Sequence, residues 1–110
     1  MSDGKNVIVH STRQGKEPFN DWLDSLDATL QQRVDARIDR LELGNYGNHK
    51  RRFRGIIELR LHFGKGYRIY CGEDGNTMVI LLAGGDKSSQ DNDIKQALEY
   101  WKEHYDQKKI

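Results

Sequence analysis

The sequence predicts an α+β domain with the element order β-α-α-β-β-β-α. Two kinds of segment predict this class: short runs of β-branched and aromatic residues between glycine-rich turns, and segments with apolar residues at helical spacing. The 110 residues also match the usual size of one domain with its own core. We therefore expect a single domain over residues 1–110, with a mainly antiparallel sheet and with the helices packed on one sheet face.

The first half of the chain is expected to form one strand and a helical hairpin. The run NVIVHST has the β-branched residues of a strand. Pro18 then begins a short helix, PFNDWLDSL, because the first helical position has no partner for an N–H group. Asp27 is expected to cap a longer helix that Gly44 ends. The apolar stripe of this helix contains Leu30, Val34, Ile38 and Leu41. Its other faces are filled by Gln31, Arg33, Asp35, Arg37 and Asp39.

The second half is expected to form three successive strands and a helix. The segments IIELRLHF, GYRIYC and TMVILLA have the composition of strands and are joined by the turn sequences GKG and GEDGN. The third strand is apolar on both faces and is expected to be central. Asp91 or Asp93 then caps a helix over DNDIKQALEYWKEHY. Its buried stripe is expected to contain Ile94, Ala97, Leu98, Trp101 and Tyr105.

The hairpin between the first two of these strands separates an apolar face from a charged face. Pairing through a tight turn at residues 64–66 sets His62 opposite Arg68 and Arg60 opposite Tyr70. Alternation directs one set of side chains to the core: Leu59, Leu61, Phe63, Tyr67, Ile69 and Cys71. The other face contains Glu58, Arg60, His62, Arg68 and Tyr70. This face is either ordinary solvated surface with a Glu58–Arg60 pair or a cationic floor that binds a phosphodiester.

Basic residues are concentrated in one segment of the chain. Residues 49–68 contain seven Lys and Arg against one Asp or Glu, whereas the whole chain has a net charge of +1. Such a block fits a local phosphate-binding surface, although a solvated loop has the same composition. Asp86 and Lys87 add a charge pair at the rim of the charged strand face. The candidate contacts to nucleic acid are Lys50, Arg51, Arg52 and Arg54 in HKRRFRG, together with Arg60 and Tyr70.

Other function classes lack their residue patterns. The four His and one Cys have no zinc-ligand spacing, AGGDKS lacks the spacing of a phosphate-binding loop, and no Ser/His/Asp arrangement is readable. We expect neither a metal nor a cofactor. Cys71 has no second cysteine with which to form an internal disulfide, which indicates a reducing compartment. The N-terminus lacks the pattern of a signal peptide and no apolar run could span a membrane, so we expect a cytoplasmic protein without membrane contact.

The segment ELRLHFGKGYRIYCGEDGNTMVILLAGGDKSSQDNDIKQA resembles the pattern LR…YR.YY…LL..F.KKTQ…I..A of the RelE/ParE superfamily of small bacterial toxins, in its HigB-like and phage Gp49-like branch. The resemblance extends from the helical hairpin to the last helix and implies a RelE-like fold. It also implies a toxin encoded beside a cognate antitoxin of the helix-turn-helix type. Most characterised branches cleave messenger RNA in the ribosomal A site. The alternative is a non-enzymatic DNA gyrase inhibitor of the ParE type, or a phage-derived nucleic-acid-binding regulator.

The resemblance assigns roles to individual positions. Arg68 matches the arginine that family members use at the scissile phosphate, and Lys87 matches the second basic residue of KKTQ. Asp86 stands where the first lysine of that motif usually is. Arg60 matches the arginine of LR, whose role is catalytic or structural. RelE places a tyrosine shortly after the basic pair, where this chain has Asp93, and Tyr100 and Tyr105 come later.

Cleavage of RNA without a metal requires removal of the 2′-OH proton, stabilisation of the charged phosphorane and protonation of the leaving 5′-oxygen. Arg68 and Lys87 suit the second task, because a guanidinium binds two phosphate oxygens and stays charged. His62 is the candidate base or acid, since an imidazole exchanges a proton near neutral pH. Asp86 is an alternative base with helix capping as its competing role, and His49 is a weaker candidate than His62.

Overall fold

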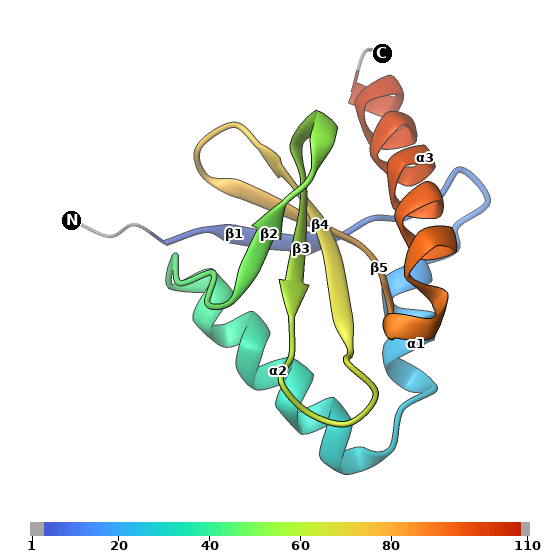
Figure 1. Ribbon diagram of the computed structural model, residues 1–110. Helices are drawn as coiled ribbons and strands as arrows, with labels where there is room; N and C mark the ends of the chain where they lie inside the picture. Colours follow the sequence, from blue (N-terminus) through green and yellow to red (C-terminus); the bar gives the residue numbers. More distant parts are fainter. Residues whose placement is uncertain (1–3, 109–110) are drawn as a thin grey trace.

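Within residues 4–108, which it describes, the computed structural model contains three helices and five strands (Figure 1). The helices are α1 (Pro18–Asp24), α2 (Ala28–Glu42) and α3 (Gln90–Lys108). The strands are β1 (Asn6–Val9), β2 (His49–Arg51), β3 (Ile56–Arg60), β4 (Arg68–Asp74) and β5 (Met78–Gly85). Short 3-10 helices lie at Phe53–Gly55 and Lys87–Ser89. The expected element order is confirmed, with the strand β2 added inside the expected basic loop.

The five strands form one sheet in the order β1-β5-β4-β3-β2. β1 pairs with β5 in parallel, and the other neighbours are antiparallel, as expected for a mainly antiparallel sheet. β5 has partners on both sides and its apolar residues are buried, so the expected interior position is confirmed. The sequence did not predict β2, because this strand has only three residues, all exposed, and lies at the sheet edge.

The helices cover both faces of the sheet, which corrects the expectation that they share one face (Figure 1). Phe19 of α1 and Val34 of α2 belong to one core cluster, together with alternate residues of β3, β4 and β5. Ala97 and Trp101 of α3 belong to a second cluster, with Ile56, Tyr70, Ile80 and Leu82 from the opposite face. The apolar stripe of α3 is correctly predicted, but a stripe does not specify which side of a sheet it covers.

The predicted faces of β3 and β4 are confirmed, but their register is wrong by two residues. Arg60 lies opposite Arg68 and Glu58 opposite Tyr70, because residues 61–67 form a longer connection than a tight turn. A shift of two residues leaves every side chain on its original face, since strands alternate with a period of two. The side chains expected in the core therefore pack there.

β5 contains a bulge on the part of the sheet that α3 covers. Tyr70 pairs with Ala83 and Cys71 pairs with Leu81, so Leu82 is the extra residue. Leu82 and Ala83 both join the cluster under α3. Beyond the bulge, Gly84 faces the indole of Trp22 and Gly85 faces α3.

The ends of the helices confirm some expected caps and correct one. Asp27 accepts a hydrogen bond of 2.9 Å from the backbone N–H of Leu30. Pro18 begins α1, and α2 ends at Glu42 before Gly44, whose φ is +86°. The expected cap of the last helix is wrong, because Asp86 caps the preceding 3-10 turn and Asp91 and Asp93 lie in the first turn of α3. No helix within residues 4–108 is long and apolar enough to cross a membrane.

Candidate functional site

A completely buried carboxylate on β3 organises the basic residues around it. Glu58 Oε1 lies 2.8 Å from Arg52 Nη2, and Glu58 Oε2 lies 2.8 Å from Arg60 Nε and 3.5 Å from Arg68 Nε. Gln90 Nε2 donates to Oε1 over 3.1 Å. The Glu58–Arg60 pair of the solvated-surface alternative is present, but Glu58 is buried rather than solvated and has three arginines around it.

Glu58 stays ionised in this cluster. Burial alone would raise the pKa of its carboxyl, but the hydrogen bonds from Arg60 and Arg52 outweigh burial and hold the pKa below its ordinary value. One negative charge then faces three guanidinium groups, so the cluster keeps a positive charge. A cluster of this kind favours a nearby anion.

Arg68 is held close to the surface with part of its hydrogen-bonding capacity unused. Its side chain is 13% exposed, and Nη1 donates to the carbonyl of Gly66 over 2.5 Å. Its Nε atom is buried and has no hydrogen-bond partner within residues 4–108. The connection 61–67 also lies against Lys87. A Cβ on Gly66 would lie 3.1 Å from Arg68 Nη1 and 3.4 Å from Lys87 Cβ, so the base of the Lys87 side chain is near the Arg68 guanidinium. Gly66 has a φ of +73°.

Three of the sequence-predicted site residues line one hollow, which we call the central groove. It has a volume of about 420 Å3 and is lined by Asn48, Arg60, Leu61, His62, Phe63, Gly64, Gly66, Tyr67 and Arg68. No carboxylate is among these described lining residues. The side chain of His62 is exposed, and Asn48 Nδ2 donates to His62 Nε2 over 2.6 Å. The structure thus brings Arg60, His62 and Arg68 together, with Lys87 beside Arg68.

Arg37 positions the wall of the central groove, a role that the sequence reading missed. It is buried, whereas it was expected on the polar side of its helix. Its guanidinium donates to the carbonyls of Arg60 over 2.5 Å, Tyr46 over 2.7 Å and Asn48 over 2.6 Å. These bonds tie α2 to the residue that contacts His62. The signal available in the sequence was the spacing of Arg33, Arg37 and Arg40, which lie on one helix face.

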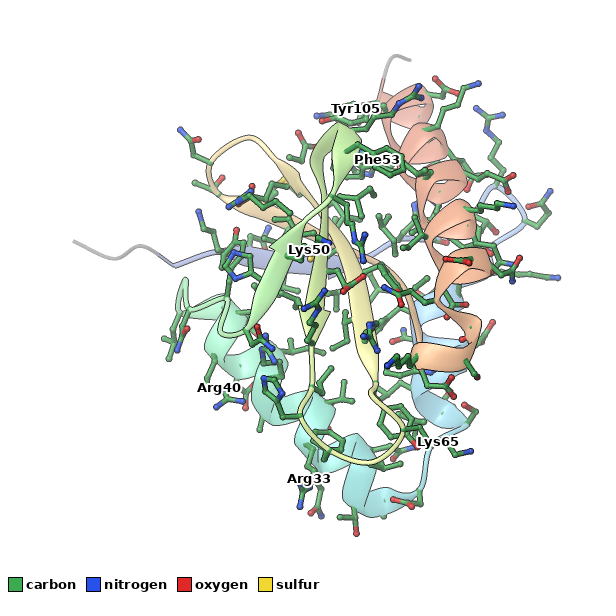
Figure 2. All side chains as sticks on the ribbon, in the orientation of Figure 1. Arg33, Arg40, Lys50, Phe53, Lys65 and Tyr105 are labelled. Carbon is green, nitrogen blue, oxygen red and sulfur yellow. The ribbon has the colours of Figure 1, made fainter. Side chains whose placement is uncertain are left out.

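Other predicted contacts lie away from the central groove. Tyr70 is completely buried, so the expectation that it lies on an exposed face is wrong. Burial, and then the charge of Glu58, raise the pKa of Tyr70 far above its ordinary value. Arg51 lies on the α2 side of the sheet and pairs with Glu73 at 2.7 Å. Lys50 is exposed on β2, opposite Glu58 (Figure 2).

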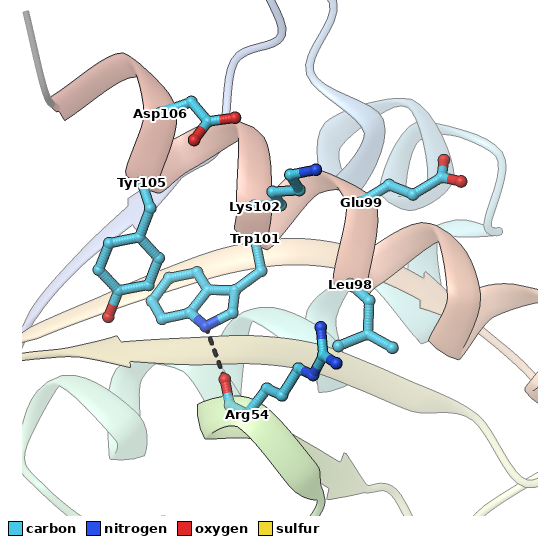
Figure 3. A pocket seen from close by; sticks show the side chains of 7 residues that line it. All are labelled: Arg54, Leu98, Glu99, Trp101, Lys102, Tyr105 and Asp106. Carbon is cyan, nitrogen blue, oxygen red and sulfur yellow. Dashed lines mark hydrogen bonds between the residues drawn. The ribbon is translucent and has the colours of Figure 1, made fainter.

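Arg54 borders a separate hollow beneath α3 (Figure 3). Its backbone is in the left-handed region with a φ of +60°, and its carbonyl accepts a hydrogen bond of 2.9 Å from Trp101 Nε1. The hollow has a volume of about 580 Å3 and is lined by Arg54, Leu98, Glu99, Trp101, Lys102, Tyr105 and Asp106. We call it the α3 hollow. Tyr105, expected in the buried stripe, is 40% exposed here.

The alternative bases are engaged in local structure. Asp86 Oδ1 accepts hydrogen bonds from the backbone N–H and the hydroxyl of Ser88, and these bonds lower the pKa of Asp86. This is the capping role that competed with a catalytic one. His49 pairs with Leu59 on β3, so its side chain lies on the opposite sheet face from Glu58, against the ring of Tyr46.

Comparison with known proteins identifies relatives of the chain. The sequence profile of the family described as "Phage derived protein Gp49-like (DUF891)" matches residues 21–102, which include α2, the central groove and much of α3. A protein of Haemophilus influenzae with the description "Uncharacterized protein" is 49% identical over 80 residues, which are 72% of this chain and 81% of the relative. The Gp49-like branch expected from the strand motifs is confirmed. This chain belongs to the phage-derived Gp49-like family.

Proposed function

We propose that this protein is the toxin component of a type II toxin–antitoxin system and cleaves messenger RNA on the ribosome, in the cytoplasm. The observation that carries the proposal is the meeting of Arg60, His62 and Arg68 in a groove without a lining carboxylate, with Lys87 beside Arg68. Phosphodiester chemistry needs cations at the phosphate and a proton acceptor near the ribose, and these residue types supply both. Membership in the Gp49-like family supports the same proposal.

The proposed reaction assigns tasks to His62, Arg68 and Lys87. His62 takes the proton of the ribose 2′-OH, and the freed oxygen attacks the phosphorus. Arg68 and Lys87 stabilise the negative charge that develops on the phosphoryl oxygens. The bond from phosphorus to the 5′-oxygen then breaks, and this oxygen takes a proton from a water molecule. The hydroxide that remains takes the proton held by His62, which restores the neutral ring. The products are a 2′,3′-cyclic phosphate and a 5′-hydroxyl end. In the free protein Asn48 Nδ2 donates to His62 Nε2, so Nε2 holds the lone pair of the neutral ring. The ribose 2′-OH takes the place of Asn48 at this nitrogen.

Arg68→Ala tests the proposal most directly. Loss of one preorganised donor to the transition state should slow cleavage by roughly 100-fold, and growth arrest on expression should disappear. Primer extension on translated messenger RNA measures cleavage, and thermal unfolding measures stability. Lys95→Gln is the control, because Lys95 is an exposed cation of α3 outside the groove. The nuclease proposal fails if Arg68→Ala cleaves as well as the wild type, or if the wild type makes no ribosome-dependent cuts.

A non-enzymatic inhibitor of DNA gyrase, or a nucleic-acid-binding regulator, is the second candidate function. The convergence of Arg60 and Arg68 on Glu58 favours it, because both arginines then have a structural partner. In this case Arg68→Ala and Glu58→Ala should lower the melting temperature to a similar extent. A supercoiling assay with purified gyrase identifies the inhibitor, since only a gyrase inhibitor blocks supercoiling. A nucleic-acid-binding regulator would neither block supercoiling nor cut messenger RNA.

We further propose that an amphipathic segment of a cognate helix-turn-helix antitoxin covers the α3 hollow. Phe53 and Tyr105 are 58% and 40% exposed, and the hollow is lined by both apolar and charged side chains. This composition suits a helix with one apolar face and polar flanks. Co-expression with the neighbouring gene product and affinity capture should recover a complex that Tyr105→Asp weakens. Two folded proteins that do not associate would count against the toxin assignment.

A further inference from the structure

The central groove continues onto α2. A second hollow of about 270 Å3 is lined by Arg33, Ala36, Arg37, Arg40, Leu61, His62 and Phe63. Leu61, His62 and Phe63 also line the central groove, so the two hollows meet at these residues. We call the second hollow the α2 groove. Together they form one path from Arg68 to the outer side of α2.

The charge along this path differs from that of other hollows on the molecule. None of the described residues that line the central groove or the α2 groove is acidic. Three other hollows each include at least one carboxylate, from Glu99, Asp93 and Glu73 respectively. Along this path Glu58, buried beneath the surface, pairs with Arg60 and Arg68, so the positive charge is only partly balanced. A flexible polyanion is the partner that the remaining charge favours.

Two of the three arginines of the α2 groove have no acidic partner among residues 4–108, and the third, Arg37, is buried against backbone carbonyls. Arg33 and Arg40 form no ion pair within residues 4–108. The guanidinium carbon of Arg33 lies 4.7 Å from the ring centroid of Phe63, which orients the group without neutralising it. Burial, and then the charge of Arg40, lower the pKa of Arg37. Arg33 and Arg40 lie along the outer side of α2 in Figure 2.

We propose that Arg33 and Arg40 bind backbone phosphates of a single-stranded RNA, next to the phosphate held at Arg68. The strand passes from Arg68 over His62 and Phe63 and continues along α2. A cationic groove with interspersed aromatic rings is the arrangement that proteins use for single strands, because the cations bind phosphates and the rings contact bases. That the strand is RNA rests on the proposed function.

A salt titration with a matched pair of double variants tests this path. The probe is a fluorescein-labelled single-stranded RNA of about 12 nucleotides, methylated at each 2′-oxygen so that it cannot be cleaved. Arg33→Gln with Arg40→Gln removes two charges from the α2 groove. Lys16→Gln with Lys95→Gln removes two exposed charges elsewhere. Anisotropy gives the dissociation constant at each salt concentration, and thermal unfolding verifies that both variants are folded.

The two variants should behave differently. The groove variant should bind roughly 10-fold more weakly near 0.1 M salt, and the slope of log K against log salt should fall by about 1.4, since each lost phosphate contact on a single strand removes about 0.7. The control should keep the wild-type slope. Arg33→Lys with Arg40→Lys should restore most of the slope, because the charges return.

Any one of the following results would exclude the proposed RNA path. An unchanged slope in the groove variant excludes phosphate contacts by Arg33 and Arg40, and an equal loss in the control shows that binding follows net charge alone. Tighter binding of duplex DNA than of the single strand also excludes the proposal. Cleavage on the ribosome tests the proposed function separately. If the wild type cuts messenger RNA but the groove variant keeps the wild-type slope, the nuclease proposal stands and the RNA path is excluded. If the slope changes but the wild type makes no cuts, the RNA path stands and the nuclease proposal is excluded.

Discussion

The two faces of the sheet have different interiors. Under α1 and α2, aliphatic and aromatic side chains fill the space between helices and strands. Under α3, an apolar cluster around Trp101 lies beside the buried carboxylate of Glu58 and its partly exposed arginines. α3 contacts β5, β4 and β3, whereas Lys50 of β2 on the same side is exposed. The partial cover by one helix leaves room for a charged cluster at the edge of a core, and the site is built there.

The largest loss of stability should come from removing the buried carboxylate on the α3 side of the sheet. Glu58→Ala should lower the free energy of unfolding by about 3–5 kcal/mol at neutral pH, because three arginines lose their buried counter-ion. Leu59→Ala on the opposite face should cost about 2–5 kcal/mol for a different reason, the loss of buried apolar contacts. Urea denaturation at several pH values distinguishes them.

The pH dependence of these two variants should differ in a defined direction. The pKa of Glu58 is lower in the folded protein than its ordinary value of about 4.3 in an unfolded chain. Its contribution to stability is therefore full above the ordinary value and is lost as the pH falls through the folded value. The cost of Glu58→Ala should shrink with acid while that of Leu59→Ala stays constant. Equal costs at all pH values would show that Glu58 acts by packing alone.

Arg37, which ties α2 to the backbone of Tyr46, Asn48 and Arg60, should rank next. Arg37→Met should cost about 3 kcal/mol, because three carbonyl groups lose a charged donor. Arg37→Lys should recover part of this cost, since an ammonium group still donates. Arg40→Met, at an exposed position of the same helix, should change stability by less than about 0.5 kcal/mol. Thermal unfolding gives the ranking, and equal effects at Arg37 and Arg40 would contradict it.

Substitutions at two glycines test how tightly α1 and α3 pack on the two faces of the sheet. A Cβ on Gly84 would overlap the indole of Trp22, and a Cβ on Gly72 would lie 2.6 Å from the indole of Trp101. Each Gly→Ala change should cost about 1–3 kcal/mol through overpacking, with Gly84 the more sensitive. Trp101→Leu should reduce the cost of Gly72→Ala and leave that of Gly84→Ala unchanged. Strictly additive unfolding energies for Gly72 and Trp101 would refute the contact.

The smallest expected effect is a gain in stability at the start of α3. Burial, and then the charge of Asp86, raise the pKa of Asp93 despite a hydrogen bond from Ser89. A carboxyl whose pKa is raised by folding destabilises the folded protein at neutral pH and ceases to do so below its ordinary pKa, about 3.9. Asp93→Asn should therefore raise the melting temperature by about 1–3 °C at neutral pH and by nothing near pH 3. A lower melting temperature at neutral pH would contradict this.

The alternation of residues was sufficient to predict which side chains share a face of the strands. It was insufficient to predict which helix covers each face. Alternation along β3 and β4 placed Leu59 and Ile69 in the core even though the predicted register was wrong. The same pattern made Glu58 and Tyr70 look solvated, because polar side chains on a strand do not reveal a helix above them. α3 was correctly recognised as amphipathic, but a buried stripe fits either sheet face.

The sequence predicted which side chains meet in the candidate site, but not the residues that hold them in place. Arg60, His62 and Arg68 were grouped by alternation and do meet in one groove. Arg37 was missed because its carbonyl partners come from chain segments that only the tertiary fold brings together. Tyr70 was misplaced for the reason given above. β2 was missed because a three-residue edge strand has too few positions for alternation to be visible.

The parallel pairing of β1 with β5 determines when this chain can fold during its synthesis. Asn6 pairs with Met78 and Val9 pairs with Leu81, so β1 has no partner strand until most of the chain has been made. Contacts between such distant segments form late, because a long loop must close first. β1 therefore stays without its partner strand while residues 10–77 are made, and the sheet closes only when β5 has left the ribosome.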